Sequence, residues 1–168
     1  DALKYKKSAS SQIQRLLGNV VLSHDSVVMY CDSAHFYSSK NYFRAFGNVR
    51  MLRGEMLLQC DSMLYNGNTL RGKAIDRVIF TKDEMRLSTD LLYFSRNSKQ
   101  IWYTTGASIV QPTGTLYSKV GTYFTNQSLF HFSDSVRIRQ EDYYIESDSM
   151  HHWQDLDVSM FFGPTHLE

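Results

Sequence analysis

The chain has 168 residues and a formal net charge of +1; 42% of its residues are hydrophobic and 14% are aromatic. This hydrophobic content, with a mean hydropathy of −0.37, excludes a disordered tail, and no apolar run approaches the ~18 residues of a membrane-spanning helix. The even charge balance argues against a nucleic-acid-binding protein, which would carry a clustered basic excess. Two cysteines cannot build a disulfide framework or a four-thiolate zinc site. The chain begins with a polar stretch that lacks the apolar segment of a signal peptide. This is expected of a sequence that starts after the signal peptide has been removed.

An internal repeat is the strongest pattern in the sequence. Similar segments surround four aspartates at spacings of 29, 29 and twice 29 residues: Asp32, Asp61, Asp90 and Asp148. The skipped position holds Lys119, within a degenerate copy. Repeats of this length are typical of arrays in which each unit buries its apolar face against its neighbours. The sequence therefore predicts five 29-residue copies.

In chain order, three parts are expected. Residues 1–17 form an N-terminal tail and the end of a partial repeat, because Ile13 to Leu17 resembles the last strand of a copy. Residues 18–162 form the repeat domain. Residues 163–168 form a C-terminal tail, in which Gly163-Pro164 resembles the start of a truncated copy.

Each copy has the local pattern of β-strands. The segment Val27 to Asp32 is β-branched and aromatic, and its counterparts Met56 to Asp61 and Met85 to Asp90 alternate with period 2. Asn, Asp and Gly recur between such segments, as in turns. We expect three short strands per copy, each near the usual ~5–6 residues, and almost no helix. The fold class is all-β: an elongated, two-walled open β-jelly roll or flattened solenoid, with parallel and antiparallel pairing both possible.

Apolar columns of the repeat predict the interior. Eight of their members are Leu22, Met29, Met51, Leu58, Phe80, Leu87, Leu116 and Ile145. They would line either a slot that admits a ligand or a core filled by side chains. Small interior residues, among them Ala34, Gly72, Ala74, Ala107 and Gly121, could leave room for a ligand or accept a neighbour's aromatic ring.

No catalytic, metal or cofactor site is expected. A thiol nucleophile is suggested by Cys31, Asp32 and His35, with Cys31 and His35 on one strand face. A catalytic site should interrupt the repeat, however, and this segment follows the repeat pattern. Cys31 and Cys60 are interpreted as buried free thiols rather than a disulfide. The neighbouring histidines at 151 and 152 should point to opposite strand faces, so they cannot easily share a metal ion. The aspartate column is expected to cap turns or bond backbone at a bend.

A motif at the copy boundaries resembles a known family. It combines Gly-Asn-Val with a strand that ends in an aspartate followed by apolar and aromatic residues; it reads Gly18-Asn19-Val20, Asp32–Phe36, Gly47-Asn48-Val49 and Asp61–Tyr65. This combination resembles the organic-solvent-tolerance A-like family, the LptA/OstA family of periplasmic lipopolysaccharide-transport proteins, over the chain from about residue 13. The sequence departs from the motif at Asp76-Arg77-Val78, at Thr105-Gly106-Ala107 and at Lys119.

The resemblance implies a taco-shaped β-jelly roll that carries lipid across the periplasm without enzymatic activity. Acyl chains of lipopolysaccharide or a related glycolipid would lie between two sheets, against the eight interior residues named above. Partners would be the jelly-roll domains of inner- and outer-membrane transport proteins. From the residues alone, a closed-core scaffold or a carbohydrate-binding repeat using exposed aromatics such as Tyr30, Tyr117, Tyr144 and Trp102 remain alternatives.

The ends of the array predict association. Unpaired strand edges invite strand addition, and the apolar first and last rungs carry few charges or prolines that would prevent it. Edge contacts are expected at Val20, Leu22, Met160, Phe161 and Phe162. Because the two ends differ, a contact between them would be head-to-tail and open-ended.

Overall fold

The computed structural model describes residues 6–7, 13–24 and 26–168. Their strands all join one antiparallel sheet. The strands are β1 (Lys6–Lys7), β2 (Ile13–His24), β3 (Val27–Tyr37), β4 (Tyr42–Arg53), β5 (Met56–Asn66), β6 (Arg71–Lys82), β7 (Met85–Ser95), β8 (Gln100–Tyr103), β9 (Ala107–Gln111), β10 (Gly114–Ser118), β11 (Val120–Phe124), β12 (Leu129–Arg139), β13 (Tyr144–Trp153) and β14 (Val158–Leu167). Two 3-10 turns, η1 (Ser38–Lys40) and η2 (Gln154–Leu156), are the only helical elements of the described residues.

The long strands bend in the middle at β-bulges. In β4, Gly47 and Asn48 together oppose the single residue Asp61 of β5, and the register shifts there. Both bulge residues are left-handed, with φ of +73° and +47°. Glycine adopts this backbone without strain and asparagine tolerates it, which explains the Gly-Asn pairs in the sequence. Equivalent shifts occur at residues 18–19, 76–77, 134–135 and 163–164.

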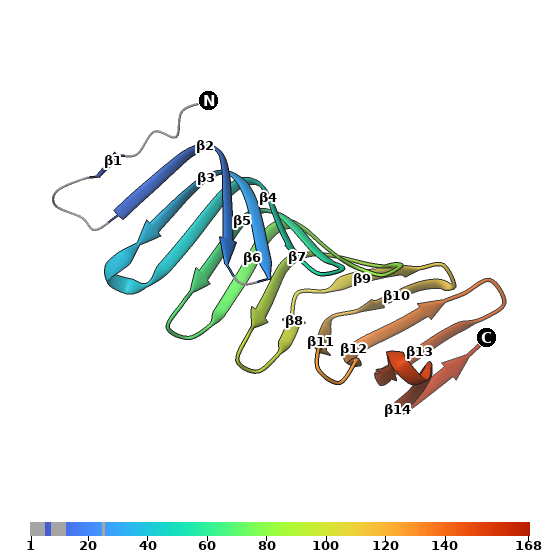
Figure 1. Ribbon diagram of the computed structural model, residues 1–168. Helices are drawn as coiled ribbons and strands as arrows, with labels where there is room; N and C mark the ends of the chain where they lie inside the picture. The colour runs from blue at the N-terminus through green and yellow to red at the C-terminus, as the bar shows by residue number, and fades with distance from the viewer. Residues whose placement is uncertain (1–5, 8–12, 25) are drawn as a thin grey trace.

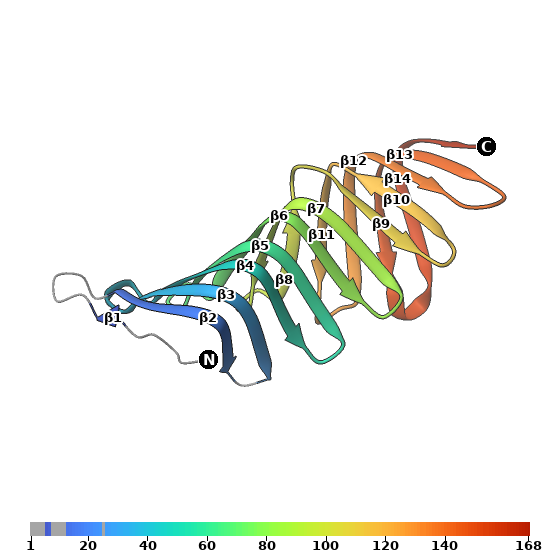
Figure 2. The same ribbon diagram turned by 90° about the horizontal axis from the view of Figure 1, so that it is seen from above.

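The bends divide the sheet into two walls that meet along a ridge (Figure 1). Wall 1 comprises residues 13–17, 33–46, 62–75, 91–104, 120–133 and 149–162; wall 2 comprises residues 20–24, 26–31, 49–60, 78–89, 107–118, 136–147 and 165–167. The hairpins follow one another along the length of the molecule, from β2 to β14 (Figure 2). The sheet is thus an elongated, folded ribbon rather than a closed barrel.

The predicted all-β, elongated, two-walled architecture and the near absence of helix are confirmed, and the open question of direction is settled as antiparallel. The expectation of three short strands per 29 residues is wrong. Each such unit in residues 13–95 is a hairpin of two strands, 11 or 12 residues long. The bulge residues looked like a turn in the sequence, but a bulge kinks a strand without ending its pairing.

The repeat is interrupted where the sequence departs from its motif. Between β8 and β9 the strand breaks at residues 104–106, and Lys119 separates β10 from β11. The gap is still bridged, because Lys119 accepts a backbone hydrogen bond from Gly106 and donates one to Asp134. The predicted boundaries at 17/18 and 162/163 lie inside β2 and β14, and residues 1–5 and 8–12 of the expected tail lie outside the described residues.

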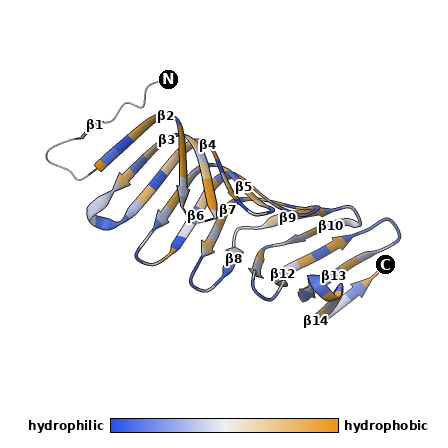
Figure 3. Cartoon of the chain, viewed as in Figure 1, coloured by the Kyte–Doolittle hydropathy of each residue, from blue (hydrophilic) through white to orange (hydrophobic). Residues whose placement is uncertain are grey.

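Hydrophobic and hydrophilic residues alternate along the strands (Figure 3), which gives each wall an inner and an outer face. The inward residues form one continuous core cluster running from Val20 to Met150. On β3 the inward parity changes at the bend: Cys31 is buried in wall 2, whereas Ala34, three residues on, is buried in wall 1. Core and outer faces therefore continue smoothly around the ridge.

Candidate lipid-binding interior

The inner face of wall 2 carries an unbroken row of apolar residues. We call it the aliphatic ladder; each member pairs with the next across the sheet, in the order Leu22, Met29, Met51, Leu58, Phe80, Leu87, Ile109, Leu116, Ile138, Ile145 and Leu167. All eight residues proposed from the sequence as interior lipid contacts belong to it. The structure therefore brings together side chains that span 124 positions of the chain, from Leu22 to Ile145.

The inner face of wall 1 carries an aromatic-rich row. This aromatic ladder runs Gln14, Phe36, Phe43, Tyr65, Gly72, Phe94, Ile101, Tyr123, Phe130, His152 and Ser159. Nearer the ridge, wall 1 presents a second inward row of mixed size: Leu16, Ala34, Ala45, Met63, Ala74, Leu92, Tyr103, Gly121, Phe132, Met150 and Phe161.

The middle of the interior is filled. Phe80 and Leu87 of wall 2 and Tyr103 and Phe132 of wall 1 are all at most 4% exposed. They line a residual space of about 10 Å³, too small for more than one water molecule. Tyr123 and Phe130 stack with ring centres 4.2 Å apart. In the middle of the molecule, the apolar columns of the repeat therefore form a core filled by side chains rather than a slot for a ligand.

Towards β2, the interior is less closed. Leu22, Met29 and Met51 of the aliphatic ladder are only partly buried, and so is Phe43 of the aromatic ladder. Leu58 is buried, while Leu116 and Ile145 are again partly buried beyond the middle. Apolar side chains of the inner faces are thus within reach of solvent or a ligand at the end of the molecule that starts with β2.

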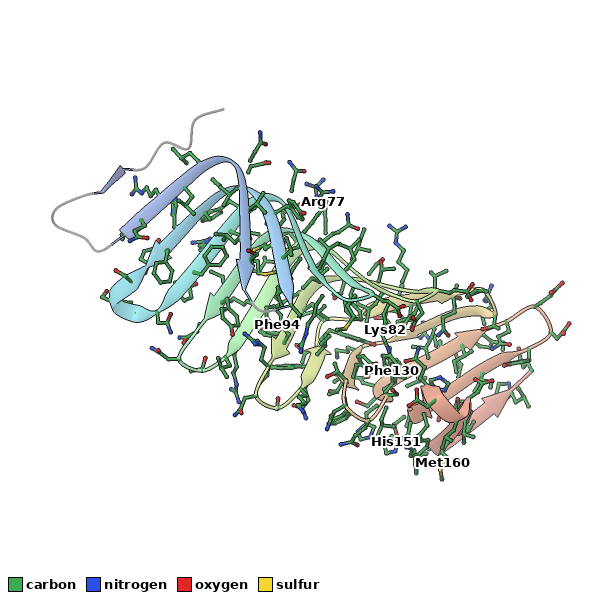
Figure 4. All side chains as sticks on the ribbon, viewed as in Figure 1. Arg77, Lys82, Phe94, Phe130, His151 and Met160 are labelled. Carbon is green, nitrogen blue, oxygen red and sulfur yellow. The ribbon has the colours of Figure 1, made fainter. Side chains whose placement is uncertain are left out.

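A lysine ties the free margins of the two walls together. Lys82, the last residue of β6, donates hydrogen bonds from Nζ to Tyr123 Oη (2.8 Å) and Gln154 Oε1 (3.3 Å). Burial lowers the pKa of Lys82, but the bond to Tyr123 and nearby negative charge outweigh it, so the pKa is raised and the ammonium is kept. Figure 4 places Lys82 near Phe130, in the middle of the molecule. The sequence does not predict this link, although Lys82 lies two residues after Phe80 and so shares its inward parity.

Glycines in the interior make room for rings rather than for a ligand. A Cβ on Gly72 would lie 2.3 Å from Phe94 Cζ, and one on Gly121 would lie 2.4 Å from Tyr103 Cζ. Small interior residues could leave room for a ligand or accept a neighbour's ring, and Gly72 and Gly121 have the second role. The alanines at 34, 45 and 74 remain as the small residues of the wall 1 interior near β2.

Two buried hydroxyl groups of tyrosine differ in their partners. Tyr103 Oη is hydrogen-bonded to Ser118 Oγ, and burial raises the pKa of Tyr103 to about 12. Tyr65 Oη is buried with no hydrogen-bond partner among the described residues. A buried donor without a hydrogen-bond partner costs free energy. A ligand atom that accepts a hydrogen bond from Tyr65 Oη would recover part of that cost.

Neither cysteine, nor the His151-His152 pair, builds a reactive site. Cys31 and Cys60 are buried free thiols on β3 and β5, which are separated by β4, so they lie two strand spacings (~9–10 Å) apart, beyond disulfide reach. Burial raises the pKa of Cys60 to about 12, which keeps it protonated. His151 stacks on His131 outside wall 1, whereas His152 faces Phe130 inside. The described residues contain no group of three metal-ligating side chains.

Two smaller expectations need correction. Cys31 and His35 do not share a face, because the inward parity changes at Asp32: His35 lies outside wall 1, against Phe46. Two of the ridge aspartates bond side chains of the next strand rather than backbone: Asp32 accepts from Asn48 Nδ2 (2.8 Å), and Asp61 accepts from Arg77 Nε (2.9 Å). Figure 4 shows Arg77 at the ridge, away from the interior.

The predicted edge residues divide between core and surface. Val20 is 2% exposed and Leu22 is partly buried, so both belong to the interior. Met160 and Phe162 are 49% and 39% exposed on β14, and Phe161 packs on the core. Among the described residues, β14 pairs only with β13, while β2 is covered by β1 over two residue pairs.

Comparison with known proteins identifies relatives of the sequence. The sequence model described as "OstA-like protein" matches residues 1–148. No curated protein matches the chain. Among solved structures, the crystal structure of LptH, the LptA-homologous periplasmic component of the lipopolysaccharide transport device of Pseudomonas aeruginosa, is similar with a TM-score of 0.34 and 12% identity, over 84% of this chain and 93% of that one. No helix among the described residues is long and apolar enough to cross a membrane.

Proposed function

Because the chain belongs to the OstA-like family, we propose that it is a non-enzymatic lipid carrier that holds the acyl chains of a lipopolysaccharide-like glycolipid between its two walls. The observation that carries the proposal is the aliphatic ladder, a continuous apolar row that becomes accessible towards β2. Each buried acyl methylene contributes roughly 0.8 kcal/mol, so a row of this length suits several long chains better than one small ligand.

The proposed ligand lies with its acyl chains on Leu22, Met29 and Met51 and its polar head outside the walls. Tyr65 Oη then donates a hydrogen bond to an ester or amide carbonyl near the head. Lys82 and the filled core behind it limit how far the chains extend in the closed form. Movement of lipid past the middle requires the two walls to separate there.

In this proposal the protein works in the periplasm as one segment of a bridge to the outer membrane. The exposed apolar residues Met160 and Phe162 on the edge strand β14 support strand addition, either to a second copy or to a partner's jelly-roll domain. A proline at Met160 should abolish this association without unfolding the inner strands. Light scattering over a wide concentration range measures it, and a strict monomer throughout leaves only the partner jelly roll.

A closed-core scaffold is the second candidate, and the filled middle around Tyr103 favours it. The carbohydrate-binding alternative has divided support. On the outer ladder of wall 2, Tyr30 and Tyr117 are separated by five residues that are not aromatic (Arg50, Gln59, Ile79, Ser88 and Ser108). On the outer face of wall 1, Trp102 stacks on Tyr93. Native mass spectrometry of protein purified from cells separates the candidates, because only a carrier should retain glycolipid.

Site-specific photo-crosslinking tests the interior directly. A photoreactive residue at Met51 faces inward, whereas one at the next position, Leu52, faces outward and is 38% exposed. Met51 should capture lipid and Leu52 should not. Equal labelling at the two positions would contradict an interior site. Tyr65→Phe should weaken lipid retention without lowering stability, because the hydroxyl has no protein partner to lose.

A further inference from the structure

The two walls differ in charge near the β2 end of the molecule. In wall 1, residues 33–46, 62–75 and 91–104 contain no Asp or Glu, and their basic residues are Lys40, Arg44, Arg71, Lys73, Arg96 and Lys99. In wall 2, residues 49–60 and 78–89 carry both signs: Arg50, Arg53, Lys82 and Arg86 with Glu55, Asp83 and Glu84. The near-neutral total charge therefore conceals a strongly cationic stretch of wall 1.

The outer face of wall 1 carries one ladder along the whole molecule. This outer ladder runs Arg15, His35, Arg44, Leu64, Lys73, Tyr93, Trp102, Thr122, His131, His151 and Met160, each paired with the next. Its first half is basic and its second half is aromatic. Tyr93 stacks on Trp102 with ring centres 5.5 Å apart, and the rings of His131 and His151 are 3.8 Å apart. Figure 4 shows the His151 and Met160 end of the ladder, at β13 and β14.

Apolar side chains accompany these charges on the same face. Leu17, next to Arg15, is 46% exposed, and Met160 at the other end is 49% exposed. The Arg44 guanidinium lies 4.6 Å from the ring centre of Phe46. The rings of Phe46, Tyr93 and Trp102 on this face are partly buried. Cationic groups beside partly buried rings are typical of protein surfaces that lie in a lipid headgroup layer, where Tyr and Trp sit between water and acyl chains.

We propose that the outer face of wall 1 binds the surface of an anionic lipid bilayer. Lys73, Arg44 and the basic residues at the wall 1 turns pair with lipid phosphates, while Tyr93 and Trp102 enter the headgroup layer. An acidic protein would match the basic half of the ladder but leave the stacked rings of Tyr93 and Trp102 without a complement. The binding is independent of any lipid between the walls, since these side chains point to the opposite face.

The two tryptophans provide a direct reporter, because Trp102 and Trp153, the only two in the chain, both belong to wall 1. Vesicles of phosphatidylcholine with a minority of phosphatidylglycerol, and of phosphatidylcholine alone, are prepared with brominated acyl chains. Tryptophan fluorescence should be quenched by the anionic vesicles, weakly or not at all by the neutral ones, and less as salt is added. Absence of quenching by anionic vesicles at low salt would overturn the proposal.

Matched charge reversals identify the face. Arg44→Glu with Lys73→Glu alters wall 1, and Arg50→Glu with Arg86→Glu makes the same change of net charge on wall 2. Each Lys or Arg near an anionic surface is worth about fivefold in partitioning, so the wall 1 variant should bind at least about 25-fold more weakly. The wall 2 variant should keep most of its binding. Equal losses would mean that net charge alone attracts the protein, and would overturn an assignment to this face.

Two further measurements keep the test conclusive. Thermal unfolding followed by circular dichroism verifies that each variant is folded, and the milder pair Arg44→Gln with Lys73→Gln replaces the reversal if it is not. A bulky substitution inside, Ala45→Phe, should abolish glycolipid retention and leave vesicle binding unchanged. Loss of one activity without the other thus distinguishes failure of the carrier proposal from failure of the bilayer proposal.

Discussion

The β2–β7 half and the β8–β14 half share a sheet, a ridge and the aliphatic ladder, but they differ in what faces that ladder. In the first half the ridge-side inward row of wall 1 contains three alanines (Ala34, Ala45 and Ala74) beside the larger Leu16, Met63 and Leu92; in the second half the same row contains the rings of Tyr103 and Phe132 beside Gly121. In the aliphatic ladder, Met29 and Met51 of the first half remain partly exposed, as do Leu116 and Ile145 beyond the filled middle. We interpret this difference in side-chain size as the reason that the interior is filled around Tyr103 and less closed near Met29 and Met51.

Emptying the filled half should have the largest effect. Tyr103 is 2% exposed, and Tyr103→Ala removes a ring packed against Gly121 and the hydrogen bond to Ser118. Buried aromatic-to-alanine changes cost about 3–5 kcal/mol in the free energy of unfolding. Denaturant unfolding measures this loss.

Met51→Ala is the matched change in the accessible half. Because Met51 is already partly exposed, its truncation should cost about 1–2 kcal/mol, less than the cost at Tyr103. If the two variants lost equal stability, the two halves would be equally packed and the distinction drawn between them would be wrong.

Alkaline pH should weaken the filled half through Tyr103. Its pKa is raised from the usual 10.0 to about 12, chiefly by burial. A raised folded-state pKa contributes stability below the unfolded-state pKa, and that contribution is lost as pH rises from about 10 through about 12. The loss is roughly 2–3 kcal/mol for this group.

Tyr103→Phe isolates that contribution. Urea unfolding at neutral and at alkaline pH should show a smaller alkaline loss in this variant than in the unmodified protein, while Cys60, whose pKa is also raised, titrates in both. Ser118 keeps a partner in the variant, because its Oγ also donates to the Val120 carbonyl. Identical pH profiles would show that ionisation of the Tyr103 hydroxyl does not change the free energy of unfolding.

The alternation of residues within each copy was enough to predict the all-β class, and the repeat period was enough to predict that the eight interior residues share one row, because equivalent residues share a column. It was not enough to predict the strands. Gly47-Asn48 has the composition of a turn, and only the pairing partner, Asp61, reveals that it is a bulge. Likewise Lys82 shares its parity with Phe80, but its bonds to Tyr123 and Gln154 depend on how the two walls approach each other, which no single column records.

Substitutions at the ridge bulges should act through backbone strain rather than through core packing. Gly47 has φ +73°, and a Cβ there would lie 2.4 Å from Asp32 Oδ2. Gly47→Ala should therefore cost about 1–3 kcal/mol, from backbone strain and from displacement of the carboxylate. Gly18→Ala is the control, because Gly18 has φ +81° but no atom within 4 Å of the added Cβ, so it carries only the strain. Chemical denaturation of both variants separates the two costs, and equal costs would mean that Asp32 moves aside freely.

The smallest effect concerns the ion pairs across the ridge, whose order differs between the halves. Asp61 on β5 pairs with Arg77 in the bulge of β6. Lys119, between β10 and β11, pairs with Asp134 in the bulge of β12 at 3.2 Å, so the positive and negative partners have exchanged places. Lys119 therefore replaces the aspartate of the other copies, and Asp134 supplies the opposite charge that keeps an ion pair at this position. Lys119→Asp restores the residue of the other copies but sets two carboxylates against each other, so it should destabilise the fold by about 0.5–1 kcal/mol at low salt. Adding Asp134→Lys should recover that loss, and added salt should reduce it. If Lys119→Asp alone were stabilising in thermal unfolding, the aspartate itself would matter at the ridge rather than the pairing of opposite charges.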